Sequence, residues 1–173
     1  YAYGNYYEGE MLNGSANGDG EFLYADGTHY IGQWENFEFH GHGVITYPNG
    51  HHYEGAFKYG NQHGFGTSTW PSGARHQGEW KNNQENGYGI STWLDGTYAE
   101  GEFKNGRLNG KGVLEYANGG KQIGQFKDNS LIGKGIVILP DGSQWVGSWI
   151  DSFVPEGSGI WTLPDGTKEK GEF

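Results

Sequence analysis

The side chains with the clearest potential for chemistry in this sequence are seven histidines in its first half. They are His29, His40, His42, His51, His52, His63 and His76. Imidazole nitrogens bind zinc, but a site needs three or four ligands at about 2.1 Å from one ion. If equivalent residues such as His40 and His63 lie two strands apart, roughly 10 Å separates them, and no carboxylate or thiolate pattern completes a set. We therefore predict no metal site and no cofactor.

Glycine pairs such as Gly64 and Gly66 look like the start of a nucleotide-binding loop. A phosphate-binding loop lies between a strand and a helix, whereas these pairs precede strand-like segments and recur in every repeat. No Ser-His-Asp arrangement or pair of carboxylates forms a catalytic motif, and Glu100 and Glu102 are typical of a solvated strand edge. The sequence therefore predicts a protein that is not an enzyme and has no catalytic residues.

The glycines instead mark a repeat of 23 residues. Each repeat has a glycine at its third position, as in Tyr30 and Gly32 or Tyr53 and Gly55. We predict a single array over residues 1–173, with a partial repeat at 1–6, repeats at 7–29, 30–52, 53–75, 76–98, 99–121, 122–144 and 145–168, and a partial repeat at 169–173. The seventh repeat has one extra residue near Pro155. The pattern continues to both ends, so we expect a longer array.

Each repeat is predicted to form two strands. Positions 1, 3 and 5 alternate with polar residues, and positions 12, 14, 16 and 18 do the same. Repeats are joined by segments such as Pro48–Gly50, in which proline presets φ, Asn, Asp or Ser bonds its own backbone, and glycine takes a positive φ. The link inside a repeat is expected to be longer, over roughly positions 6 to 11. These short reversals predict an all-β fold, a solenoid-like, elongated, twisted antiparallel sheet of stacked β-hairpins whose aromatic rings pack over glycines.

Composition narrows the classes of partner. The net charge is -10, and the first 57 residues contain no Lys or Arg. Such a surface repels phosphate backbones and anionic lipids, so we predict no nucleic-acid partner and regard membrane contact as disfavoured. The chain has no cysteine and no apolar run long enough to cross a bilayer.

The repeats resemble the MORN repeat (membrane occupation and recognition nexus), whose units are similar to Y-x-G-x-W-x-x-G-x-x-x-G-x-G-x-x-x-x-x-x-G. The segment Ala99–Lys121 departs from this pattern mainly at its first residue. The resemblance covers essentially the whole chain. It implies a β-hairpin scaffold of the kind found in cilia and flagella, including radial spokes, in cytoskeletal and cell-division structures, at membrane junctions and beside catalytic domains. From it we expect a cytoplasmic protein associated with the cytoskeleton, a cilium or a flagellum.

The leading functional hypothesis is a non-catalytic scaffold for protein–protein interaction, which binds helical or extended segments, associates with itself, or does both. One alternative is a membrane or phospholipid attachment module. Another is the non-catalytic MORN region of a larger enzyme. A carbohydrate-binding module fits less well, because the repeats of such modules are nearer 20 residues and place their aromatic residues differently.

Two interpretations of the aromatic stripe remain open. Its residues at position 5 are Trp34, Phe57, Trp80, Phe103, Phe126 and Trp149, and those at position 18 include Tyr47, Trp70, Trp93 and Tyr116. They form the core of a sheet that has nothing else with which to exclude water, or they line a groove whose partly open rings receive a partner. Phe37 and Phe39 break the rule of their repeat, and local packing and a role as partner anchors are both consistent with them.

The other face of the predicted sheet becomes apolar late in the chain. Its residues are Ile123, Ile136, Ile138, Val146 and Ile160, and the nearby loops contain Leu131, Ile132, Ile150, Phe153 and Val154. A solvated face needs no such residues, and a contiguous apolar patch usually marks an interface. We predict a partner or self-association surface here, the alternative being burial beneath the chain's own long loop.

Overall fold

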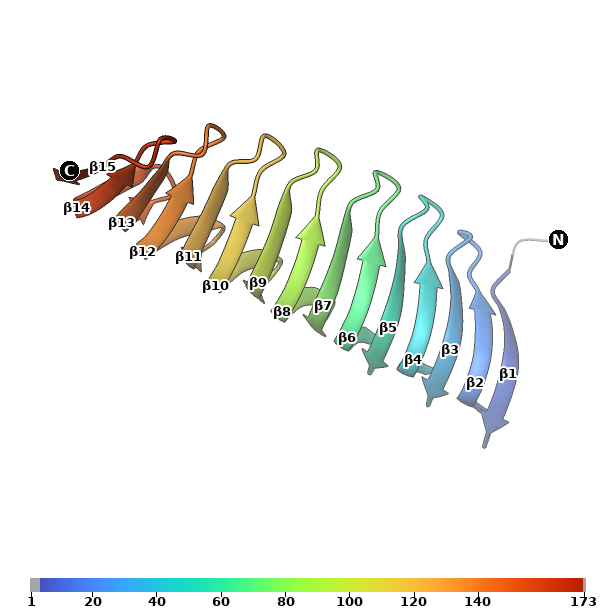
Figure 1. The fold of residues 1–173 in the computed structure, drawn as a ribbon. Coiled ribbons are helices and arrows are strands. Elements are labelled where there is room, and N and C mark those ends of the chain that lie inside the picture. The colour runs from blue at the N-terminus through green and yellow to red at the C-terminus, as the bar shows by residue number, and fades with distance from the viewer. Residues whose placement is uncertain (1–3, 173) are drawn as a thin grey trace. The chain divides into compact units, whose positions relative to one another are not determined.

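The computed structural model describes residues 4–172, which form strands and turns and no helix. Fifteen strands lie in chain order in one antiparallel sheet (Figure 1). This arrangement confirms the predicted all-β sheet of hairpins. The chain divides into two compact units, one ending at Glu85 (unit 1) and one beginning at Asn86 (unit 2). Across the described residues, no helix is long and apolar enough to cross a membrane.

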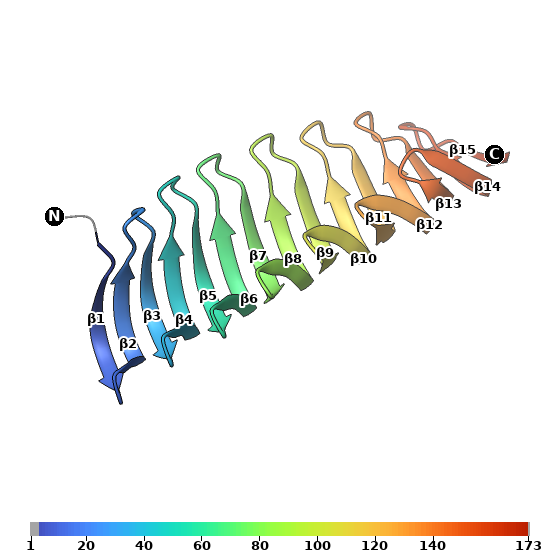
Figure 2. The ribbon, with the colours of Figure 1, turned by 180° about the vertical axis from the view of Figure 1, so that it is seen from behind.

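Both units are built from antiparallel hairpins. Unit 1 contains β1 (Tyr6–Leu12), β2 (Ser15–Leu23), β3 (His29–Glu35), β4 (Glu38–Thr46), β5 (His52–Lys58), β6 (Asn61–Thr69) and β7 (Arg75–Lys81). The boundary falls within β8 (Gln84–Thr92), and unit 2 continues with β9 (Tyr98–Lys104), β10 (Arg107–Glu115), β11 (Lys121–Lys127), β12 (Ser130–Ile138), β13 (Gln144–Asp151), β14 (Val154–Thr162) and β15 (Lys168–Glu172). In each unit the two kinds of reversal lie at opposite ends of the strands (Figure 2).

The reversals between repeats have the predicted chemistry. In the turn after β8, the Asp95 carboxylate accepts a hydrogen bond from the Thr97 N–H at 2.9 Å, and Gly96 has a φ of +87°. The same side-chain bond is made by Asp26, Asn49, Ser72, Asn118, Asp141 and Asp165. A short polar side chain therefore fixes each turn, and the glycine supplies the left-handed conformation that closes it.

The reversals inside repeats are tighter than predicted. β3 ends at Glu35 and β4 begins at Glu38, and the two residues between them, Asn36 and Phe37, have φ values of 52° and 64°. Positive φ at both central residues defines a type I′ turn, whose twist matches that of the flanking strands. The expectation of a longer link over positions 6 to 11 is wrong, because two residues are enough to reverse the chain.

A β-bulge follows each of these turns. Gly18 and Gly64, both at position 12 of their repeats, have φ values of +88° and +68°. The register shifts just before them, between Gly9 and Met11 on β1 and between Gly55 and Phe57 on β5. Two steps on β1 lie opposite four on β2, from Gly20 to Ala16, so each bulge adds two residues to one strand of the pair. Its consequence is that position 10 lies directly opposite the ring at position 5 and faces the same side of the sheet.

Successive turns are joined by hydrogen bonds in both units. Asn129, between β11 and β12, donates its N–H to the Leu108 carbonyl at 3.0 Å, and its Oδ1 accepts from the Leu108 N–H at 2.7 Å. Asn83 makes the same two bonds with Gln62 in unit 1, at 3.1 and 2.8 Å. The residue at position 8 of one repeat thus satisfies the backbone at position 10 of the repeat before it.

We expect Asn129→Ala to destabilise unit 2 by about 2 kcal/mol. Roughly half comes from the lost acceptor for the Leu108 N–H and half from alanine at a φ of +72°. Asn129→Gly keeps the backbone conformation and loses only the acceptor, so it should cost about 1 kcal/mol. Urea denaturation of the two variants measures the difference. Equal losses would show that the turn carries no conformational strain.

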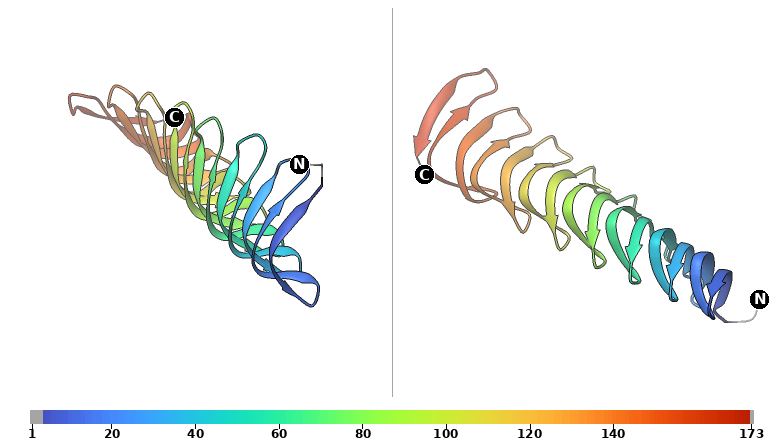
Figure 3. Two further views of the ribbon diagram at one scale, coloured as in Figure 1. Left: turned by 90° about the vertical axis from the view of Figure 1, so that its right-hand side faces the viewer. Right: turned by 90° about the horizontal axis from the view of Figure 1, so that it is seen from below.

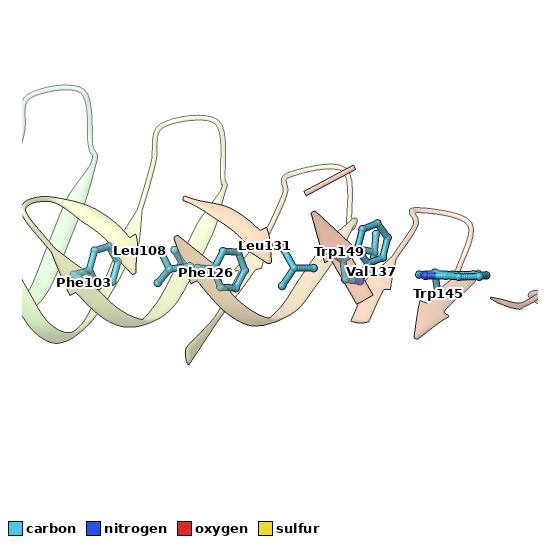
Figure 4. Close-up of a cluster of buried hydrophobic side chains, with 8 residues drawn as sticks. Phe103, Leu108, Phe126, Leu131, Val137, Trp145 and Trp149 are labelled. Atoms are coloured by element: carbon cyan, nitrogen blue, oxygen red, sulfur yellow. The ribbon is translucent and has the colours of Figure 1, made fainter. Parts of the chain in front are cut away.

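The core lies on one face of the sheet in both units, and we call it the packed face. In unit 1 it is made of Tyr30, Trp34, Tyr53, Phe57 and Trp80 together with Ala16 and Ile45. In unit 2 it is made of Ala99, Phe103, Leu108, Phe126, Leu131, Val137, Trp145 and Trp149. Figure 4 shows the labelled side chains of unit 2 in a single layer, and Figure 3 shows that the strands are curved along their length. A single layer of side chains on this face therefore forms the hydrophobic core of each unit.

Candidate functional site

Aromatic rings on the packed face of unit 1 touch one another edge to face. The Tyr30 ring lies 5.1 Å from Trp34 and 5.3 Å from Phe57, both nearly perpendicular to it. Tyr53 continues the series, 5.1 Å from Phe57 and 5.2 Å from Trp80. This geometry suits the ring quadrupoles and adds to the apolar burial. The rings therefore form a continuous layer along the packed face of unit 1.

Glycines beneath these rings leave the space that the rings occupy. A Cβ built on Gly32 would lie 2.7 Å from the Tyr30 hydroxyl, and one on Gly55 would lie 2.7 Å from the Tyr53 hydroxyl. Those hydroxyls donate to backbone carbonyls, that of Tyr30 to Gln33 at 2.8 Å. The predicted packing of rings over glycines is confirmed, and it accounts for glycine at position 3.

The six predicted site residues at position 5 are buried. Trp34, Phe57, Trp80, Phe103, Phe126 and Trp149 are only 2–6% exposed. Phe39 also packs internally, because its ring stacks on Tyr30 at 3.9 Å. Phe37 is 50% exposed, with its ring 6.1 Å from that of Tyr7. The structure therefore places the position 5 rings and Phe39 in the core and leaves Phe37 on the surface.

Position 18 holds the more open part of the aromatic stripe. Tyr47 and Trp70 are half-buried, and Trp93 is 44% exposed. The His51 imidazole lies between Tyr47 and Trp70 and stacks on each at 5.1 Å. Burial lowers the pKa of His51, with a further contribution from His52. His51 thus belongs to an aromatic stack, which is a structural role.

Three of the remaining histidines, His29, His40 and His76, lie beside carboxylates. His40 lies 3.1 Å from Glu35, and His29 lies 2.7 Å from Glu21. No group of three or more His, Asp or Glu side chains in residues 4–172 is arranged to hold a metal ion.

Sequence reasoning missed the row at position 10. This row consists of Ala16, Phe39, Gln62, Glu85, Leu108 and Leu131, and most of these side chains are buried. Glu85 lies 3.7 Å from the imidazole of His76, which is itself 1% exposed. Burial raises the pKa of Glu85 to about 7 and lowers that of His76 to about 4. The Asn-Gly pairs at positions 7 and 8 were the available signal, since they predict a two-residue turn and hence this register.

An apolar groove opens on the packed face of unit 2. Phe153, which is 73% exposed, borders two adjoining hollows that share Val137 and Leu139. The first hollow includes Trp145, Trp149, Pro155 and Trp161, and the second includes Tyr116 and Pro140. We call this surface the Phe153 groove and define it by Tyr116, Val137, Leu139, Trp145, Phe153 and Trp161. Several aromatic rings surround open space in this groove.

The backbone beside Phe153 is held in place. The Ser152 hydroxyl accepts a hydrogen bond from the Leu131 N–H at 2.9 Å, and the Ser152 carbonyl accepts one from the Gln122 side chain at 3.2 Å. Ser152 is 6% exposed, whereas its neighbour Phe153 stands clear. The longer seventh repeat therefore holds the backbone that carries this exposed ring beside the groove, so little backbone freedom remains to be lost there on binding.

The predicted apolar patch lies on the other side of the sheet, which we call the opposite face. Ile123, Ile136 and Ile138 are partly exposed there, and Val146 and Ile160 are 43% and 42% exposed. Phe153, on the loop expected to cover them, lies instead beside Trp145 on the packed face. The loop does not bury this patch.

Comparison with known families supports the interpretation of the repeats. The MORN repeat matches residues 7–29, 30–52, 53–75, 76–98, 100–121 and 154–168. A comparison with curated protein sequences gave no match.

Two solved structures are similar in fold. One is the TCP domain of SAS-4 (dCPAP) of Drosophila melanogaster in complex with a proline-rich motif of Ana2 (dSTIL), with 17% identity, a TM-score of 0.56, and coverage of 91% of this chain and 86% of that one. The other is the G-box domain of the microcephaly protein CPAP, described as suggesting a role in centriole elongation, with 16% identity, a TM-score of 0.50, and coverage of 98% and 99%. At these identities the likeness shows a shared sheet architecture.

Proposed function

Because the chain belongs to the MORN-repeat family, we propose that it is a non-catalytic scaffold that binds an extended segment of a protein partner in the Phe153 groove. The observation that carries this proposal is an exposed ring, 73% accessible, beside a face whose other aromatic rings are buried or partly buried. Neighbouring rings at Trp145 and Trp161 line the same hollow. A partner side chain placed there would bury apolar surface on three sides.

The chemistry of the groove suits a proline-containing segment. Proline-rich peptides adopt an extended helix with few internal constraints to lose, and they dock between aromatic side chains. The groove offers Tyr116, Phe153 and Trp161 for this purpose, with Lys121 and Glu169 at its margins. The structure of the SAS-4 TCP domain, with a TM-score of 0.56 to this chain, contains a proline-rich motif. That likeness supports the same class of ligand here.

The proposed setting is a cytoskeletal assembly, in the cytoplasm or at a cilium or flagellum. Its support is the family resemblance together with the centriole-related description of the CPAP G-box domain. A membrane role is less favoured, because the net charge is -10 and unit 1 contains only Lys58, Arg75 and Lys81 as basic residues. Anionic lipids attract clusters of cations, and unit 1 offers none of the required density.

Fluorescence anisotropy with a labelled proline-rich peptide tests the proposal. We expect micromolar binding, and we expect Phe153→Ser to weaken it at least about tenfold, since the exposed ring contributes roughly 1.5 kcal/mol or more. Phe65→Ser is the matched control, because Phe65 on β6 is 60% exposed and does not line the groove. It should bind the peptide as tightly as the wild type does.

Two outcomes would overturn the proposal. One is wild-type affinity for Phe153→Ser, and the other is an equal loss for Phe65→Ser. Flotation with phosphoinositide vesicles at physiological salt distinguishes the membrane alternative, because a scaffold of this charge should remain unbound.

A further inference from the structure

A row of apolar side chains crosses the opposite face of unit 2. The strand register pairs Val113 with Ile123, Ile123 with Ile136, Ile136 with Val146, and Val146 with Ile160. Five neighbouring strands, β10 to β14, therefore each contribute one β-branched residue at the same height. We call these five residues the isoleucine row. With about 4.8 Å between strands, it is roughly 20 Å long.

Sheet formation alone does not require this row. The equivalent positions of unit 1 run Glu8, Glu21, Ile31, Val44, Glu54, Thr67 and Gln77 in the same register. The strands of unit 1 pair as regularly as those of unit 2, although most of these positions hold charged or polar side chains. The unbroken run in unit 2 is thus an additional property of its surface, and exposed apolar rows of this kind mark interfaces.

Opposite charges end the row. Val113 pairs with Glu100 on β9 at one end, and Ile160 pairs with Lys170 on β15 at the other. The hydroxyls of Tyr88 and Tyr98 both donate to the Glu100 carboxylate and hold it in position. These bonds lower the pKa of Glu100, so it remains ionised at neutral pH. The surface is acidic at one end, apolar in the middle and basic at the other end.

If a second copy of this surface is rotated by 180° and placed against the first, the basic end of each copy faces the acidic end of the other. We propose that the isoleucine row binds a second copy of this chain, face to face and with the two rows antiparallel. The proposal goes beyond the scaffold function, because it uses the face that does not contain the Phe153 groove. It commits to a like partner because Glu100 of one copy then meets Lys170 of the other, twice in each dimer.

The two-fold axis of such a dimer has a defined place. Ile136 is the central residue of the seven that run from Glu100 to Lys170, so it meets the same residue of the second copy. Ile123 then faces Val146, and Val113 faces Ile160. Two packed sheet faces lie about 10 Å apart, which suits interdigitated isoleucine and valine side chains. A contact of this limited size predicts a weak dimer with a dissociation constant of about 10–100 µM.

Sedimentation velocity over about 5–500 µM tests the dimer directly. Ile136→Asp places two carboxylates at the axis and should weaken association at least about tenfold. Val44→Asp is the matched control, because Val44 occupies the same position of the second full repeat and is also partly exposed. It should leave association unchanged.

A charge swap tests the antiparallel arrangement. Glu100→Lys and Lys170→Glu should each weaken the dimer about fivefold, because each puts like charges together twice. The double variant should return to within about twofold of the wild type. If the chain stays monomeric at all the concentrations tested, the row would have to bind a different protein, and the proposal would be overturned. A dimer indifferent to Ile136→Asp, or two swaps that fail to compensate, would do the same. Lys170 also borders the first hollow of the Phe153 groove, so peptide binding at Phe153 is scored separately in Ile136→Asp, whose residue lines neither hollow.

Discussion

Replacing Glu85 by glutamine is expected to stabilise unit 1 by about 2–3 kcal/mol at pH 8 and to have almost no effect at pH 4. Glu85 lies on the packed face with its side chain only 17% exposed, and burial raises its pKa from 4.5 to about 7. Above pH 7 the folded protein must keep a carboxylate in an apolar layer. Glutamine fills the same space without that charge.

The sign of the pH dependence follows from the direction of the pKa shift. Between pH 4.5 and about 7 the folded state still binds a proton at Glu85 that the unfolded state has released, so stability falls as the pH rises. His76 acts in the opposite sense. Its pKa is lowered from 6.5 to about 4 by burial and by Arg75, so its contribution increases as the pH rises between those values. The wild type should therefore change little between pH 4.5 and 6.5.

Urea denaturation from pH 4 to pH 9 measures both effects. In Glu85→Gln only the His76 contribution remains, and stability should increase with pH up to about 6.5. Glu54→Gln, an exposed change on β5, is the control and should leave the curve unchanged. Destabilisation by Glu85→Gln at pH 8 would contradict this account and would indicate a charged pair with His76, whose imidazole lies 3.7 Å from the carboxyl group.

The second large effect is expected from Gly43→Ala, which should destabilise unit 1 by about 3 kcal/mol or more. A Cβ at Gly43 would lie 2.6 Å from Cζ of Tyr30, and its three nearest neighbours all belong to that one side chain. Tyr30 cannot move away, because it is fully buried and stacks on Phe39 at 3.9 Å. The added methyl group therefore forces strain into the whole aromatic series.

A double-mutant cycle separates crowding by the ring from crowding by the backbone. With Tyr30→Leu already present, Gly43→Ala should cost less than about 1 kcal/mol, because the obstructing ring is gone. Gly32→Ala should not be rescued, since its Cβ would also lie 2.7 Å from the His42 carbonyl oxygen. Thermal unfolding of the five variants supplies the comparison. Additive losses for Gly43→Ala and Tyr30→Leu would exclude ring-on-glycine packing as the source of the constraint.

Local chemistry made much of the fold predictable. Each Pro-x-Gly turn contains a short polar residue whose conformational preference is intrinsic, and Asp141 bonds to the Ser143 N–H as expected. Alternation of rings and glycines likewise determined which side of each strand is packed. These features depend on residues close together in sequence, which is why a single repeat is enough to reveal them.

The features that escaped prediction depend on register. Position 10 holds alanine, phenylalanine, glutamine, glutamate or leucine, so its composition gives no sign of burial. Only the bulge beside Gly18 and its equivalents places that position directly opposite the buried ring at position 5. The separation of buried Trp149 from exposed Phe153, residues close in sequence, likewise depends on how Ser152 is held. Apart from the turn residues at positions 7 and 8, the pattern of residue types gives no sign of these contacts.

Hydrogen–deuterium exchange with and without a proline-rich peptide tests the central claim that the Phe153 groove is the partner site. Residues 116–122, 137–143 and 152–155, which line or adjoin the groove, should exchange more slowly in the complex. The equivalent segments of unit 1, residues 24–30 and 45–51, should be unchanged. Protection confined to unit 1, or no protection in a complex that demonstrably forms, would contradict the account.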